Sequence, residues 1–174
     1  PPETIREACI PEFRKAVEFK NASLRYPNSS APVLRDISLS IPFGASVAVV
    51  GRTGAGKTTL INQLLGLLQP TSGEIRIDGT LLDGVTRRAW QGNIAYIPQD
   101  VFLFDDTVRA NITFGVADHE IDHERVRSVL KTAQLEQLVG ENMAGLDMRI
   151  GERGARISGG QRQRLGIARA LYHD

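Results

Sequence analysis

The sequence has 174 residues, of which 41% are apolar and 24% are charged, with a formal net charge of +1 at pH 7. This is the composition of an ordinary globular domain, long enough to bury a core. The near-neutral charge gives no general attraction to nucleic acids or anionic membranes, and we expect no nucleic-acid partner. No apolar run approaches the ~20 residues that cross a bilayer, and the single cysteine, Cys9, can form no internal disulfide.

The first part of the chain predicts a tail followed by strands. Residues 1–15 mix prolines with charged side chains, which predicts a linker or tail. From residue 16, "AVEFKNASLRY" and later "VLRDISLSI" alternate apolar and polar residues, as half-buried strands do. The run "SVAVV" at 46–50 is almost wholly apolar and β-branched, which predicts a strand buried on both faces.

Helices and strands are predicted to alternate beyond this run. A helix is expected after residue 57, with Pro70 as its stop signal, and "TSGEIRIDG" and "NIAYIP" predict two further strands. From about residue 100 to 160 the pattern is mostly helical, and "SGGQRQRLGIARALY" predicts a helix that begins at a serine N-cap. The apolar face of the helix before it is formed by Val126, Val129, Leu130 and Ala133. Strands that feed helices predict an α/β domain with a helical insertion.

The segment "GRTGAGKTTL", residues 51–60, carries the clearest chemical signal. It satisfies G-x-x-x-x-G-K-[ST] between a predicted buried strand and a predicted helix. Glycines let successive backbone N–H groups point into one concavity at a helix N-terminus, where the helix dipole favours anions. We therefore expect a nucleoside triphosphate here, with Lys57 on its β- and γ-phosphates and the Thr58 hydroxyl on Mg²⁺. The expected nucleotide contacts are Gly51, Arg52, Thr53, Gly54, Ala55, Gly56, Lys57, Thr58 and Thr59.

A second glycine turn, "ISGGQRQR" at 157–164, opens another predicted helix. Taken alone, it is a capped helix start. Together with a phosphate loop it suggests a second anion-binding turn, and one chain seldom needs two such turns for one triphosphate. Two chains facing head to tail could place the γ-phosphate between the loop of one chain and this turn of the other.

With these two motifs the sequence resembles the nucleotide-binding domain of ABC transporters, from Ala16 to the end of the chain. The turn at 157–164 matches the family's signature motif, with Ile157 where leucine is usual. The resemblance implies a P-loop α/β fold with an antiparallel β element near its N-terminus and a helical subdomain at about 100–160. It also implies that the γ-phosphate of an ATP on an opposing subunit contacts Ser158, Gly159, Gly160 and Gln161.

Two further positions take roles from the same resemblance. "YIPQD" matches the Q-loop, which implies that Gln99 contacts Mg²⁺ and the attacking water and couples the site to a membrane partner. Lys57 and Gln99 are thus the catalytic candidates. Tyr26 matches the aromatic residue that stacks on adenine, although taken alone a tyrosine at this position is more often a core or surface residue.

The region around the Q-loop resembles the exporter branch of the family. "VFLFDDTVRANITFG" implies that Phe102 and Phe104 lie near the groove that receives the membrane domain, with plain core packing as the alternative. Glu152 and Arg153 match the X-loop of exporters. The wider stretch 89–107 is similar to lipid-linked oligosaccharide flippases, and residues 1–15 resemble the connection that descends from a last transmembrane helix.

In the family, the aspartate and glutamate of the Walker B strand and the switch histidine follow the signature helix, and this sequence ends before them. We therefore expect a fragment or a truncated product that is poorly soluble and does not hydrolyse ATP alone. His173 cannot inherit the histidine's role, because it ends the signature helix. His119 and His123 have metal-ligand spacing without a third ligand, which favours a solvated acidic turn.

The implied function of the intact protein is an ATP-driven exporter motor on the cytoplasmic face of a membrane. Its partners would be a second nucleotide-binding domain and a transmembrane domain fused upstream. Two alternatives remain open at this stage: a clamp that binds ATP without hydrolysing it, and a soluble ABC protein that transports nothing. The transported molecule, the direction of transport and the identity of the dimer partner are not indicated.

Overall fold

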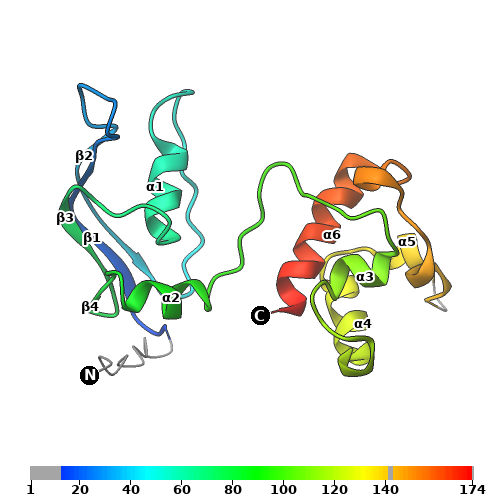
Figure 1. Ribbon diagram of the computed structural model, residues 1–174. Coiled ribbons are helices and arrows are strands. Elements are labelled where there is room, and N and C mark those ends of the chain that lie inside the picture. The colour runs from blue at the N-terminus through cyan, green and yellow to red at the C-terminus, as the bar shows by residue number, and fades with distance from the viewer. Residues whose placement is uncertain (1–12, 141–142, 174) are drawn as a thin grey trace, which may run out of the picture. The chain divides into compact units, whose positions relative to one another are not determined.

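The computed structural model describes residues 13–140 and 143–173 (Figure 1). The predicted tail over residues 1–15, including Cys9, lies almost wholly outside the described residues. The chain divides into two compact units, Pro1–Ile94 and Ala95–Asp174. Each unit has its own cluster of buried apolar side chains.

The first unit is built on a four-stranded antiparallel sheet. Its strands are β1 (Ala16–Leu24), β2 (Leu34–Pro42), β3 (Ser72–Ile77) and β4 (Thr80–Leu81), in the order β2-β1-β3-β4. The three longer strands confirm the predictions made from alternating residues. They also confirm the antiparallel β element expected near the N-terminus.

The register of β1 and β3 creates the core of this unit. Val17 lies opposite Ile77 and Phe19 opposite Ile75, and all four side chains are buried. Because side chains alternate across a strand, these positions share one face of the sheet. The sheet therefore presents a continuous apolar face on which helices can pack.

Helices α1 (Lys57–Leu64) and α2 (Thr86–Gln91) cover that face (Figure 1). Leu64 of α1 packs against the core cluster, and its carbonyl accepts a hydrogen bond of 2.7 Å from the indole N–H of Trp90 in α2. Helix α1 ends earlier than the predicted stop at Pro70. The physical cause is Gly66, whose φ of +67° takes the chain out of the helix.

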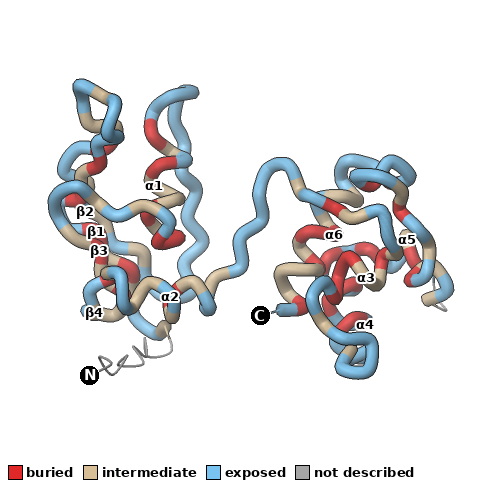
Figure 2. Tube along the Cα trace, in the orientation of Figure 1, coloured by how far each residue is buried: buried red, intermediate tan, exposed pale blue. Residues whose placement is uncertain are grey.

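The other two predictions of strands, "SVAVV" and "NIAYIP", are wrong. Residues 46–50 and 93–98 form no strand, and no strand of the described residues pairs with either run. Val50 is 87% exposed and Tyr96 is 55% exposed, so the expected burial is absent as well. Figure 2 shows both segments as largely exposed chain. An apolar, β-branched run becomes a strand only when a neighbour accepts its backbone hydrogen bonds.

A carboxylate at the β3–β4 turn fastens the start of β1. Asp78 accepts hydrogen bonds from the backbone N–H groups of Arg14, Lys15 and Ala16 at 2.7, 2.8 and 2.8 Å. Desolvation raises the pKa of Asp78, but these three donors together with the nearby Lys15 charge outweigh it. The pKa of Asp78 therefore lies below its usual value, and the ionised form holds the turn against β1.

The regular secondary structure in the described part of the second unit is helical, apart from one isolated β-bridge between Thr107 and Arg149. Its α-helices are α3 (Val108–Ile112), α4 (His123–Thr132), α5 (Glu136–Val139) and α6 (Gly159–Tyr172). Three 3₁₀ turns join them: η1 (Asp118–Glu120), η2 (Ala144–Asp147) and η3 (Glu152–Gly154). The limits of the predicted helical subdomain, 100–160, stay a prediction.

Helix α6 is the central element of this unit, because α3 and α4 both pack on it (Figure 1). Its Leu165 and Ala168 are fully buried in a cluster with side chains of α3 and α4. The predicted buried face of α4 is confirmed at Val126, Val129, Leu130 and Ala133. The helical pattern that continued beyond it breaks at Gln134, whose φ is +54°.

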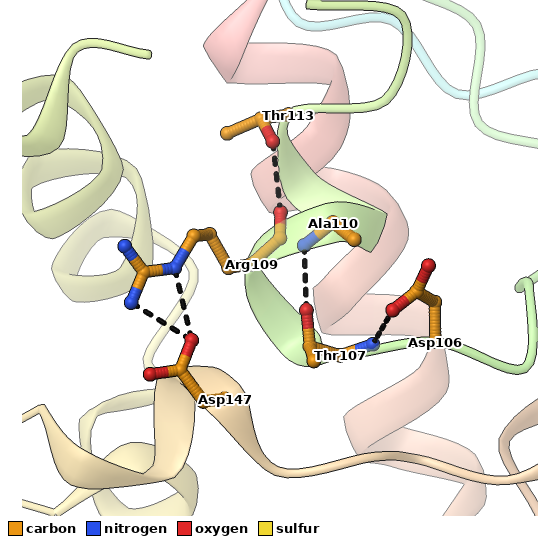
Figure 3. A network of polar contacts seen from close by, with 6 residues as sticks. All are labelled: Asp106, Thr107, Arg109, Ala110, Thr113 and Asp147. Atoms are coloured by element: carbon orange, nitrogen blue, oxygen red, sulfur yellow. Dashed lines mark hydrogen bonds and ion pairs between the residues drawn. The ribbon is translucent and has the colours of Figure 1, made fainter. Parts of the chain in front are cut away.

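The start of α3 is fixed by a small polar network (Figure 3). The hydroxyl of Thr107 accepts a hydrogen bond of 3.0 Å from the N–H of Ala110, which caps the helix. Arg109 pairs with Asp147 of η2 at 2.8 Å. Because Asp147 is 72% exposed, this ion pair orients the two segments and contributes about 0–1 kcal/mol.

We expect the Asp78→Asn substitution to loosen the start of β1, because a neutral amide is a weaker acceptor for three N–H groups. A depressed pKa in the folded state adds stability above the unfolded value of about 3.9, and that stability is lost as pH falls through the folded pKa. The unfolding midpoint of Asp78→Asn should thus be lower at pH 7 and converge on that of the unsubstituted protein in acid. Thermal unfolding of both proteins across this pH range measures the effect.

Asp105→Asn is the matched control, because the structure gives the Asp105 carboxylate no hydrogen-bond partner. It should unfold like the unsubstituted protein at every pH. An equal loss in both variants would contradict a specific role for Asp78.

Candidate functional site

The loop before α1 has the backbone curl that a phosphate requires. Gly54 and Gly56 have φ of +82° and +88°, in the left-handed region that favours glycine. Gly56 is also the N-cap of α1, and a Cβ added there would meet the side chain of Leu34 at 2.9 Å. Glycine is therefore required at position 56 by both backbone conformation and space.

Lys57 places its ammonium group across this loop. Its Nζ donates to the carbonyl oxygens of Gly51 at 2.8 Å and Arg52 at 2.9 Å. No acidic residue lies in the first turn of α1, and Thr58 in that turn is exposed. The positive helix end and the lysine together favour an anion, while the Thr58 hydroxyl is free to face a ligand.

Tyr26, in the chain after β1, lies beside the same helix. Its hydroxyl is 3.3 Å from the hydroxyl of Thr59, a buried residue of α1, and its side chain is 39% exposed. The residue is thus not a core tyrosine. Its hydroxyl lies against α1 and part of its surface is exposed, so a nucleobase could reach the residue.

The second glycine turn is a fully formed capping box at the start of α6. The Ser158 hydroxyl accepts from the N–H of Gln161 at 3.2 Å, and the Gln161 side chain accepts from the N–H of Ser158 at 2.8 Å. The capped-helix interpretation of these two residues is therefore correct as local structure. It accounts for the serine and the glutamine, but not for the two glycines between them.

No contact among residues 13–140 and 143–173 requires glycine at positions 159 and 160. A Cβ added at Gly160 would meet nothing within 4 Å, and one at Gly159 would lie 3.6 Å from the guanidinium of Arg162, an ordinary contact. Neither residue has a positive φ. Because glycine weakens a helix relative to alanine, bare backbone at these positions is best explained by close approach of a group from outside.

The second unit brings the Q-loop and the signature turn to one cavity. Gln99 and Gly159 both line a cavity of about 680 Å³, together with Arg153 of η3. Arg153 has a φ of +51°, and Arg162 donates to the carbonyl of Ile157 at 3.0 Å. Gln99 and Gly159 thus line the same cavity of the second unit, whereas Tyr26 and the phosphate loop belong to the first unit.

An aromatic cluster lies on the segment after Gln99. Phe104 meets Phe102 edge to face at 5.0 Å and stacks on Phe114 at 4.4 Å between ring centroids. Phe102 is 61% exposed and Phe114 is 51% exposed, so simple core packing does not explain them. Sequence reasoning missed Phe114 and also Arg169, whose guanidinium lies over two of these rings. The sequence signal that could have identified Arg169 is a charged residue within the otherwise apolar run "GIARALY".

A family profile with the description "ABC transporter" matches residues 34–174. The chain belongs to the ABC transporter family. A solved structure described as "a bacterial Atm1-family ABC exporter with ATP bound" is 32% identical and covers 97% of this chain, with a TM-score of 0.84. The ABC-type ATPase fold expected from the sequence is thereby confirmed.

Relatives with the name "ATP-dependent lipid A-core flippase" are similar over most of the chain. One from Ralstonia nicotianae is 43% identical over 166 residues, or 95% of the chain, and one from Cupriavidus pinatubonensis is 42% identical over 157 residues, or 90%. The chain spans 28% and 27% of these two relatives and 29% of the Atm1-family exporter. The resemblance to exporters is confirmed. The names of these relatives specify lipid A-core, whereas the sequence suggested lipid-linked oligosaccharides.

The described part of this ABC chain contains no helix long and apolar enough to span a membrane. His123 is the first residue of α4, and His119 lies in η1. Within residues 13–140 and 143–173, no group of three histidine, cysteine or acidic side chains is arranged to hold a metal ion. We therefore assign no metal-ligand role to His119 or His123.

We expect Tyr26→Ala to weaken ATP binding about tenfold, because stacking of a base on an aromatic ring contributes about 1–3 kcal/mol. Titration of the intact protein with a fluorescent ATP analogue measures the change. Tyr26→Phe is the matched control, since it keeps the ring and loses only the contact with Thr59. Unchanged binding by Tyr26→Ala would show that the ring does not face the nucleotide.

Proposed function

We propose that this chain is the ATP-binding motor domain of an ABC exporter that binds and hydrolyses ATP with Mg²⁺. The open glycine face of the signature turn carries the proposal, because no contact in the described part of the chain explains it. A phosphate loop on one unit and a glycine-containing helix start on the other are what a nucleotide sandwich between two copies requires. The two copies would close head to tail, each offering Ser158, Gly159, Gly160 and Gln161 to the other's ATP.

The residues present fit this ligand. The loop from Gly51 to Gly56 would surround the phosphates with backbone N–H groups, including those of Arg52, Thr53, Gly54 and Ala55. Lys57 would release its two carbonyl partners and donate to the β- and γ-phosphates. Thr59 would keep Tyr26 against the adenine through the contact already present.

Thr58 and Gln99 are the proposed Mg²⁺ ligands among the described residues, since an exposed hydroxyl and an amide oxygen are suitable hard donors. When bound, Mg²⁺ neutralises charge that builds up on the phosphates. Lys57 would stabilise the same charge, and Gln99 would orient water at the γ-phosphate. We assign no general base among the described residues.

The partners proposed for the intact protein are a second nucleotide-binding domain and a transmembrane domain. Residues 1–15 would form the connection from that membrane domain, and residues 16–174 would form the ATP-binding domain at the cytoplasmic face. The exposed rings of Phe102 and Phe114 support a membrane-domain contact at the aromatic cluster, because apolar rings left in solvent commonly mark an interface. The names of the similar flippases favour a glycolipid as the transported molecule.

The proposal predicts opposite effects of Gly160→Ala on folding and on activity. The added methyl group meets open space and favours helix, so the unfolding midpoint of the intact protein should stay the same or rise. ATP turnover should fall by on the order of tenfold or more, because the methyl group occupies the space that a phosphate must enter. Differential scanning fluorimetry and phosphate release measure the two effects.

Gly84→Ala is the matched control, since its added methyl group also meets open space and no role is assigned to it. It should leave turnover unchanged, whereas Lys57→Ala should remove it. Full activity of Gly160→Ala would contradict the nucleotide sandwich. Tight ATP binding with no turnover in the unsubstituted intact protein would favour a non-hydrolysing clamp.

A further inference from the structure

Arg169 lies about three turns after Ser158 on α6, at the opposite end of the helix from the signature turn. Its side chain is half-buried, and no acidic side chain of the described residues pairs with it. Desolvation lowers the pKa of Arg169, and no neighbouring negative charge compensates. A charged group taken out of water without an ion pair needs another set of contacts to hold it there.

Those contacts are three hydrogen bonds and two aromatic rings. Arg169 donates to the backbone carbonyls of Asn111 at 2.7 Å and Phe102 at 2.9 Å, and to the side-chain oxygen of Asn111 at 3.0 Å. Its guanidinium lies 5.9 Å from the ring centroids of both Phe104 and Phe114. One planar side chain thus joins α6 to the end of α3 and to all three residues of the aromatic cluster.

Asn111 completes the connection. It is fully buried, its amide N–H₂ donates to the carbonyls of Phe104 at 3.1 Å and Thr107 at 3.0 Å, and its oxygen accepts from the N–H of Phe104 at 2.9 Å. Every polar atom of this side chain is therefore used to hold the segment from Phe104 to Thr107. The arginine and the asparagine together determine where the aromatic cluster lies.

A second contact fastens the same segment to α6. A Cβ added at Gly166 would lie 2.8 Å from the side chain of Val101, so the helix and the segment after Gln99 are in close contact. Residues 101–104 are thus attached to α6 at Gly166 and again at Arg169. Such a double attachment lets the segment follow the helix when the helix moves.

We propose that Arg169, acting with Asn111, is a positioning residue that transmits movement of the signature turn to the aromatic cluster. The inference rests on the proposed function, in which Ser158 faces ATP and the cluster faces the membrane domain. Closure on ATP would displace the start of α6, and the arginine would carry that displacement to Phe102, Phe104 and Phe114. Arg169 touches no nucleotide in this scheme, so its loss uncouples the two ends without removing ATP.

The test uses the intact protein with a fluorescent label at Asp105→Cys, beside the aromatic cluster, in a background without other reactive cysteines. Position 105 is exposed, and its side chain has no described partner. ATP with Mg²⁺ should change the label's fluorescence in the otherwise unsubstituted protein. Arg169→Lys keeps the charge but loses the planar fork.

We expect Arg169→Lys to bind ATP within about twofold of the parent, while the label's response to ATP falls at least about fivefold. Arg109→Lys is the matched control, because it removes another arginine fork from the same region at an exposed ion pair (Figure 3). Its label response should equal that of the parent. Arg169→Gln, which keeps a planar donor group, serves as a second variant if the lysine variant has a lowered unfolding midpoint.

The outcomes separate this inference from the function on which it rests. An unchanged label response in folded Arg169→Lys or Arg169→Gln would overturn the inference and leave the motor function standing. Loss of ATP affinity in parallel with the label response would also overturn it, since Arg169 would then support the site itself. A parent protein that neither binds ATP nor responds to it would overturn the proposed function instead.

Discussion

The candidate site depends on two helix starts, of which α1 has no side-chain cap and α6 has the Ser158–Gln161 capping box. Helix α1 starts at Gly56 in a left-handed conformation, and α6 starts with two glycines that no internal packing requires. The first helical turn leaves N–H groups without partners, and neither helix has an acidic side chain there to neutralise them. Both helix starts favour an anion, one in each unit of the chain.

The second unit shows how the signature turn, which we propose faces a phosphate, is connected to the other end of α6. Helix α6 carries the signature turn at one end, the core residues Leu165 and Ala168 along its buried face, and Arg169 near the other end. Its close contact with Val101 and the bonds to Phe102 and Asn111 leave the segment after Gln99 little freedom. The helix is continuous from Gly159 to Tyr172, so its backbone hydrogen bonds connect the signature turn directly to Arg169.

Local patterns predicted most of the regular structure and most of the candidate site. The strands at 16–24, 34–42 and 72–77 alternate apolar and polar residues over enough positions to be recognised. The phosphate loop was recognisable because its glycines, lysine and threonine stand at spacings determined by the ligand. The runs 46–50 and 93–98 have equally clear strand composition, yet 46–50 and 95–98 carry no strand, since a strand depends on a neighbour as well as on its own residues.

By itself, the sequence determined where helices start, where strands alternate and which residues could receive a phosphate, because these depend on residues close together in the chain. Only the tertiary structure decided that Tyr26 lies against Thr59, that Asp78 holds the start of β1, and that Arg169 joins Asn111 to the aromatic cluster. The partners in these contacts are 33, 62 and 58 positions apart. No local periodicity encodes such pairs, since they arise when separate elements bury their apolar faces against one another.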